Sequence, residues 1–125
     1  MKNDNHVWDN KLPTAQMLGR WQPWHPGHQK LFGVIIKKTG QVNIMVRDVK
    51  GVDDNPFDFE TVKENILEAL KEYKNRVKVI LVPNITNICY GRGVGYKIEE
   101  IVLDEETQKI SATKIREQMR KDGKL

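Results

Sequence analysis

The sequence has 125 residues, of which 38% are hydrophobic and 30% are charged, and it carries a formal net charge of +4. This length suits one domain with a single core, and no apolar run approaches the roughly 20 residues that span a bilayer. The single cysteine, Cys89, excludes an internal disulfide and a cysteine zinc cluster. We therefore expect a cytoplasmic domain with no membrane partner.

Positive charge is spread along the whole chain. Lysine and arginine total 21 against 17 acidic residues, and acidic residues stand between the basic ones from Lys2 to Lys124. A nucleic-acid module would instead cluster its basic residues and place aromatic residues among them. We expect no nucleic-acid partner, and the surplus charge suits a small anionic substrate.

The first half of the chain alternates strand and helix patterns. Residues 1–13 carry no periodic pattern, so we expect a surface arm before a domain over residues 14–125. The short apolar run that ends at Gly19 predicts a buried strand. Helical spacing then predicts a helix over residues 28–39, with Leu31, Phe32, Ile35 and Ile36 on its apolar face. A second apolar strand is expected over residues 41–47.

The second half continues this alternation. A loop over residues 48–57 precedes Asp58, which we expect to cap a long helix. One face of that helix carries Phe59, Val62, Ile66, Leu67, Ala69, Leu70 and Tyr73. Strands are expected over residues 77–83 and 98–103, separated by a glycine-rich loop over residues 84–96.

A final helix completes the pattern. Ser111 is well placed as its N-cap, and the helix should run to about Lys121. Alternating strands and helices predict a mostly parallel sheet with helices on both faces, joined by right-handed crossovers. Ligands of such sheets bind outside the carboxyl ends of the strands.

The stretch from Gly19 to His28 reads Gly-Arg-Trp-Gln-Pro-Trp-His-Pro-Gly-His and lies on the first strand-to-helix turn. The following helix should direct unpaired backbone N–H groups and its positive dipole end at this turn, which attracts oxyanions. Histidine and arginine side chains would add charge there. The stretch therefore predicts a phosphate site, the alternative being two structural histidines in a turn.

Two motifs resemble a known family. His25-Pro26-Gly27-His28 resembles the H-x-G-H signature of the cytidylyltransferase-like nucleotidyltransferases. The run Ile110–Arg116, Ile-Ser-Ala-Thr-Lys-Ile-Arg, is similar to their second signature, I-S-x-T-x-x-R. Both motifs stand in the family order, and the resemblance covers residues 15–116. It implies a Rossmann-like three-layer α/β/α domain that transfers a nucleoside monophosphate from an NTP to a small phosphate- or phosphonate-type acceptor, releasing pyrophosphate.

The resemblance also implies roles for individual residues. The implied catalytic residues are His25, His28 and Arg116. The histidines would contact the triphosphate as the α-phosphorus is attacked, a reaction that needs alignment and charge neutralisation more than a covalent nucleophile. Arg116 and Thr113 would hold the β and γ phosphates with help from Ser111. Gly27 would let the backbone approach the nucleotide closely.

Two features bear on which nucleotide is used. The flank Gly19-Arg20-Trp21-Gln22-Pro23-Trp24 is similar to the G-R-F-Q-P-F run of archaeal nicotinamide mononucleotide adenylyltransferases, and Asn55-Pro56-Phe57 looks like the same branch, which uses ATP. This flank adds Gly19, Arg20 and Trp21 to the expected nucleotide-binding residues. Trp21 would either pack as a wall of the site or stack directly on the nucleotide, and Arg20 would either bind phosphate or brace the turn. The small size of the chain instead resembles the compact glycerol-phosphate cytidylyltransferases, which use CTP. ATP and CTP both stay open, as does the acceptor.

Two more arginines are candidates for nucleotide binding. Arg47 ends the second predicted strand beside the predicted site, where it would either reach phosphate oxygens or pair with Asp48. Arg92 lies among three glycines and two tyrosines, Tyr90 and Tyr96. That loop would either bind the base or acceptor or form a flexible turn.

No carboxylate cage for a metal is evident in the sequence. We expect Mg²⁺ as a cofactor held mainly through the nucleotide phosphates. Members of the resembled superfamily often pair, which allows a homodimer. The rival hypothesis is a noncatalytic nucleotide-binding or regulatory domain of the same fold. Its sign would be the loss of a signature histidine, and both histidines are present.

Overall fold

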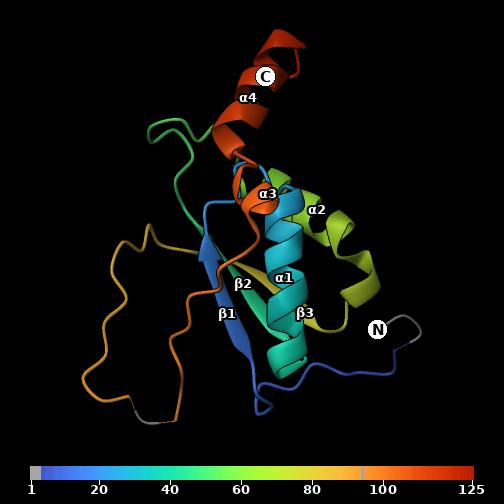
Figure 1. The fold of residues 1–125 in the computed structure, drawn as a ribbon, viewed down its shortest axis with the longest axis vertical. Helices are drawn as coiled ribbons and strands as arrows, with labels where there is room; N and C mark the ends of the chain where they lie inside the picture. Colours follow the sequence, from blue (N-terminus) through green and yellow to red (C-terminus); the bar gives the residue numbers. More distant parts are fainter. Residues whose placement is uncertain (1–3, 94) are drawn as a thin grey trace.

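The structure, a computed structural model, describes residues 4–93 and 95–125. Three parallel strands form one sheet in the order β1-β2-β3, with β1 at Ala15–Gly19, β2 at Val42–Arg47 and β3 at Val77–Val82. Helix α1 (Pro26–Thr39) connects β1 to β2, while α2 (Phe59–Ala69) and the 3-10 helix η1 (Lys71–Tyr73) connect β2 to β3 (Figure 1). Two short helices, α3 (Glu105–Gln108) and α4 (Ala112–Lys121), follow.

The core lies on one face of the sheet. Met17 is in register with Ile44 and Val79, and all three are buried. They pack in one cluster with α1 residues Phe32, Ile35 and Ile36 and with α2 residues Val62 and Ile66. Both crossover helices therefore cover the same face. Right-handed connections require this when each new strand is added on the same side of the one before it.

The opposite face of the sheet is more open. Leu18, Met45 and Ile80 share a register there, and Ile80 is 39% exposed. The Rossmann-like α/β fold with a parallel sheet is confirmed. Within residues 4–93 and 95–125 the chain forms two of the three layers of the expected α/β/α arrangement, because no described helix covers this second face.

Helix starts follow their capping residues. Asp58 caps α2 as predicted, since its carboxylate accepts a hydrogen bond from the Thr61 backbone N–H at 2.9 Å. Helix α1 begins at Pro26, earlier than the apolar pattern predicted, because His25 serves as its N-cap. The same helix ends at Thr39, and its C-cap is Gly40, whose left-handed φ of 82° is a conformation that glycine adopts easily.

The predicted strand over residues 98–103 was wrong. This segment has no strand pairing, although exposed ion pairs link it to α1, from Glu99 to Lys38 at 3.5 Å and from Asp104, directly after it, to Lys30 at 3.9 Å. Ile101 packs against the core, while Ile98 and Val102 are exposed. The local pattern correctly indicated an extended chain, but a strand also needs a backbone partner, which side-chain periodicity does not specify.

The N-terminal arm is fastened to the amino-terminal end of the sheet. Buried Gln41 donates to the Asp9 carbonyl and to Thr14 Oγ1, both at 2.7 Å. Lys78 Nζ lies 5.3 Å from the centre of the Trp8 ring. Among the described residues no helix has the length and hydropathy to cross a membrane.

Candidate functional site

The turn between β1 and α1 stacks two imidazole rings. The ring centroids of His25 and His28 are 3.6 Å apart, with 17° between the ring planes. His25 Nδ1 accepts hydrogen bonds from the backbone N–H of Gly27 at 3.0 Å and of His28 at 3.4 Å. His28 Nδ1 in turn accepts from the His25 backbone N–H at 3.2 Å. The two histidines thus form a reciprocal capping box.

This arrangement sets the protonation of both rings. An imidazole nitrogen that accepts a hydrogen bond carries no proton, so each neutral ring is protonated at Nε2. Neither Nε2 has a hydrogen-bond partner among the described residues, and neither is among the fully buried atoms that lack one. Both Nε2–H groups are therefore left unpaired by the described residues.

The surroundings keep the pair neutral. His28 packs against Trp21 and Trp24, with ring centroids 4.7 and 5.5 Å away. Burial, followed by the charge of His25, lowers the pKa of His28 to about 3. Burial also lowers the pKa of His25. At neutral pH the turn therefore offers hydrogen-bond donors rather than positive imidazolium charges.

The expectation of unpaired backbone N–H groups at the start of α1 was wrong. His25 takes the N–H groups of Gly27 and His28 through its ring, and the Gln29 N–H through its carbonyl at 3.0 Å. The imidazoles replace these backbone N–H groups as donors for a ligand. Each ring accepts a backbone hydrogen bond at Nδ1 and carries an N–H donor at Nε2. The helix start still polarises them toward an anion.

Two glycines of the turn make room for aromatic rings. A Cβ at Gly27 would lie 2.8 Å from His25 Cε1, and a Cβ at Gly19 would lie 2.7 Å from the Trp21 indole. Trp21 is 6% exposed, has a left-handed φ of 54° and donates from Nε1 to the Met45 carbonyl at 3.2 Å. It therefore forms a wall of the turn, whereas Arg20 is exposed beside it.

The second motif begins α4 as predicted. Ser111 is the N-cap, and its Oγ accepts from the Lys114 N–H at 3.4 Å. The N–H groups of Ala112 and Thr113 have no partner within the described chain. This helix start, unlike that of α1, thus keeps free backbone donors.

Arg116 joins the two motifs. It is 5% exposed, and its Nη1 donates to the Gln22 carbonyl at 2.6 Å. Its Nη2 donates to Thr113 Oγ1 at 3.4 Å, and its Nε donates to Asp54 Oδ2 at 2.8 Å. The guanidinium therefore ties α4 to the β1–α1 turn and to the loop after β2.

Helix α3 brings the start of the second motif close to the first. The Thr107 carbonyl accepts from the Ile110 N–H at 3.1 Å and would lie 3.6 Å from a Cβ at Gly27. The sequence pattern did not predict this helix. Its signal was Asp104, whose side chain caps it by accepting from the Thr107 N–H at 3.1 Å.

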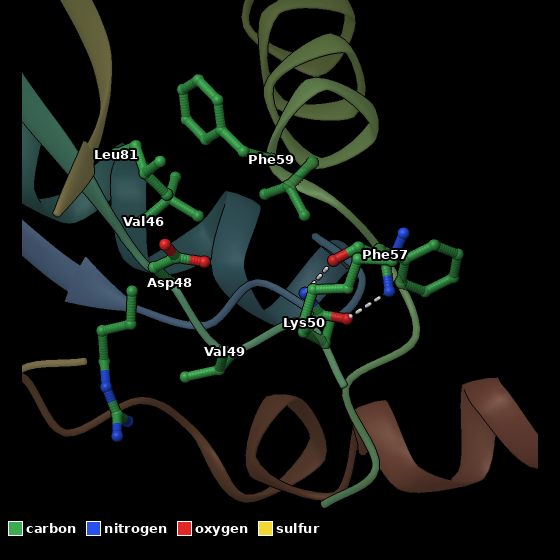
Figure 2. Close-up of a pocket in the computed structure, with 10 residues that line it drawn as sticks. Val46, Asp48, Val49, Lys50, Phe57, Phe59 and Leu81 are labelled. Atoms are coloured by element: carbon green, nitrogen blue, oxygen red, sulfur yellow. Dashed lines mark hydrogen bonds between the residues drawn. The ribbon is translucent and has the colours of Figure 1, made fainter. Parts of the chain in front are cut away.

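A small pocket lies beside the turn, beyond the ends of β2 and β3 (Figure 2). Its lining residues are Gln22, Val46, Arg47, Asp48, Val49, Lys50, Phe57, Phe59, Val62 and Leu81. Arg47 Nη2 donates to Asn84 Oδ1 at 2.7 Å, and Arg47 Nε is buried without a partner. Neither histidine lines this pocket, so Arg47 lies in a pocket next to the histidine pair and not at the pair itself.

Gln22 connects this pocket to the turn, and sequence reasoning missed it. The residue is 4% exposed, its Nε2 donates to the Phe57 carbonyl at 2.9 Å and its Oε1 accepts from the Phe57 N–H at 2.9 Å. Figure 2 marks both bonds at Phe57. A glutamine in a turn has no sequence signature for such pairing.

The loop that contains Arg92 lies away from the start of α1 (Figure 1). The orange loop of residues 84–93 and 95–100 swings away from α4 and from the start of α1 (Figure 1). Within it, the Tyr96 hydroxyl donates to the Arg92 carbonyl at 3.2 Å. We leave Arg92 out of the candidate site, which consists of the two histidines, the start of α4 and Arg116.

Among the residues described, no group of three or more histidine, cysteine, aspartate or glutamate side chains is arranged to hold a metal ion. The site consists of imidazole and backbone N–H donors and the Arg116 guanidinium group. Such a set fits a polyanion better than a directly bound cation.

No protein-family model matches the chain, and no curated protein matches it. Seven chains of solved structures match it. One is a bifunctional NMN adenylyltransferase/ADP ribose pyrophosphatase from Francisella tularensis, complexed with AMP and a manganese ion. The sequences are 24% identical, the TM-score is 0.48, and the match spans 58% of this chain and 22% of that one. At this level of similarity we draw no functional argument from the match.

Proposed function

We propose that this protein is a nucleotidyltransferase that moves a nucleoside monophosphate from ATP or CTP to a small phosphate- or phosphonate-type acceptor. The stacked pair of His25 and His28 carries the proposal. Both rings accept backbone hydrogen bonds at Nδ1, which leaves their Nε2–H donors without a partner among the described residues. A structural histidine pair needs no such open donors, whereas an oxyanion site does.

The reaction is a displacement at the α-phosphorus. An acceptor oxygen forms a bond to this phosphorus, the bond to the bridging oxygen of the β-phosphate breaks, and pyrophosphate leaves with the electron pair. Negative charge grows on the bridging oxygen and on the α-phosphate oxygens. The Nε2–H groups of His25 and His28 donate to these oxygens and stabilise the transition state.

Helix α4 would hold the rest of the triphosphate. The free N–H groups of Ala112 and Thr113 and the Thr113 side chain form a phosphate cradle at the helix start. Arg116 adds the permanent charge that the neutral histidines lack. In this proposal the first motif supplies hydrogen-bond donors at the α-phosphate, and the second supplies a cation at the β and γ phosphates.

Magnesium fits this site only as an ion carried by the nucleotide. The described residues form no metal-binding group, and Mg²⁺ commonly binds through phosphates while keeping several waters. When bound in that way it would neutralise further phosphate charge.

The test is pyrophosphate release by the full chain with each of four NTPs against a panel of phosphate, phosphonate and sulfate acceptors. We expect one nucleotide, ATP or CTP, to release pyrophosphate only when its acceptor is present. The absence of turnover with every pairing, together with no NTP binding by calorimetry, would contradict the proposal. Binding without turnover would favour the noncatalytic domain instead.

A further inference from the structure

Arg116 shares its carboxylate partner with a second arginine. Arg120 lies one helical turn further along α4, and its Nη2 bonds to Asp54 Oδ1 while its Nη1 lies 3.5 Å from Oδ2. Arg116 Nε reaches the same Oδ2 at 2.8 Å. One carboxylate thus bridges two guanidinium groups from a loop 62 residues away in sequence.

The three side chains differ in their access to solvent. The Arg116 side chain is 6% exposed, whereas those of Asp54 and Arg120 are 44% and 47% exposed. Arg116 is therefore fixed in the protein by its bonds to Gln22 and Thr113. Asp54 is the outer partner, so an anion arriving from solvent can take its place without uncovering Arg116.

Two guanidinium groups share the Asp54 carboxylate, and their hydrogen bonds, from Arg120 and then from Arg116, lower the pKa of Asp54 to about 2. The Glu117 carboxylate adds a second negative charge near Arg120. A buried guanidinium without a counter-charge is costly, and Asp54 supplies that charge in the ligand-free protein. A phosphate group presents similar forked oxygens with more negative charge, which suits two arginines better.

We propose that Arg116 and Arg120 form a paired site for the terminal phosphate of the nucleoside triphosphate. In the ligand-free protein, Asp54 occupies the two guanidinium groups until the nucleotide binds. This proposal rests on the proposed function and adds two residues to it. Arg120 lies outside the family signature and becomes a residue that recognises a triphosphate. Asp54 becomes an internal competitor for the same two guanidinium groups.

The first experiment measures the dissociation constant of inorganic tripolyphosphate by calorimetry on the full chain. Asp54→Asn removes the competing charge but keeps an oxygen for Arg116, so it should bind about five- to tenfold more tightly than wild type. Asp53→Asn is the matched control. It removes the same charge from the neighbouring position, whose left-handed φ of 51° asparagine also adopts. The control should bind like wild type.

The second experiment tests Arg120 directly. Arg120→Gln should weaken tripolyphosphate binding about tenfold, as expected for the loss of a charge-assisted contact. Binding of the nucleoside monophosphate should stay unchanged, because it lacks the terminal phosphate. Lys121→Gln, at the next and exposed position of α4, should leave both affinities unchanged. Loss of an arginine with a structural role alone would not weaken tripolyphosphate binding while leaving monophosphate binding unchanged.

Two results would overturn the proposal while pyrophosphate release by wild type still supports the proposed function. One is tripolyphosphate binding by Asp54→Asn that is no tighter than by Asp53→Asn. The other is a loss of affinity in Arg120→Gln no larger than in Lys121→Gln. If Asp54→Asn fails to fold by circular dichroism, the Arg120 comparison decides. If no variant binds tripolyphosphate or NTP, both proposals fail.

Discussion

At the scale of single residues, the central feature is that two histidines act as neutral donors. The histidine side chains were expected to add positive charge at this turn, but Nδ1 of each ring accepts a hydrogen bond from a backbone N–H, and burial keeps both rings unprotonated. An imidazole bound in this way replaces a backbone N–H donor of the helix start by its own Nε2–H donor. The permanent charge then has to come from arginine.

Gly27→Ala and Gly33→Ala should have opposite effects, although both glycines lie in α1. A Cβ at Gly27 meets the His25 ring at 2.8 Å, so the cap should be displaced at a cost of about 0.5–2 kcal/mol. A Cβ at Gly33 meets nothing within 4 Å, so the helix should gain roughly 0.5–1 kcal/mol. Denaturant unfolding measures both. A Gly27→Ala variant as stable as Gly33→Ala would contradict the packing described here.

The lowered histidine pKa values predict how stability depends on pH. The unfolded chain binds protons on these histidines near their ordinary pKa of 6.5, whereas folded His28 binds one only near 3. The free energy of unfolding should therefore be highest above pH 6.5 and should decrease as pH falls from 6.5 toward 3. His28→Asn should flatten this decrease. Equal unfolding free energies at pH 7 and pH 5 for wild type would contradict the prediction.

At the scale of elements, helix starts and their ties to neighbouring loops position the site. The caps at Asp58 and Ser111 were predictable, because side-chain oxygens before an apolar pattern are common N-caps. The His25 cap was not predictable, because it depends on a ring stacked on His28. The link from Gln22 to Phe57 was equally hidden, since it joins two loops that only the fold brings together.

Gln22→Ala should loosen that link. It removes both side-chain bonds to the Phe57 backbone and should destabilise the protein by about 1–3 kcal/mol. It should also slow pyrophosphate release, because Gln22 precedes the histidines. Gln16→Ala, on the exposed side of β1, is the control and should change stability by no more than about 0.5 kcal/mol. Equal unfolding midpoints for the two variants would argue against this role.

At the scale of the whole molecule, the sequence predicted the α/β class and the three strands, because apolar runs and helical spacing are local signals. It wrongly predicted a strand over residues 98–103, because the local pattern indicates an extended chain but the segment has no paired neighbour in the sheet. It drew attention to the two motifs at residues 25–28 and 110–116, and the fold brings them together through the bond from Arg116 to the Gln22 carbonyl. It missed Asp54 and Arg120 as partners, because a contact across 66 residues follows only from the packing of α4.

The most direct test of the whole account is the rate of pyrophosphate release by wild type and His28→Asn. Asparagine Oδ1 takes the place of Nδ1 as acceptor for the His25 N–H, so the variant should fold, but it lacks the unpaired Nε2–H donor. We expect turnover to fall about 100-fold or more, the scale seen when a transition-state donor is removed, and to recover in part in His28→Gln. A folded His28→Asn variant that releases pyrophosphate at the wild-type rate would contradict this prediction.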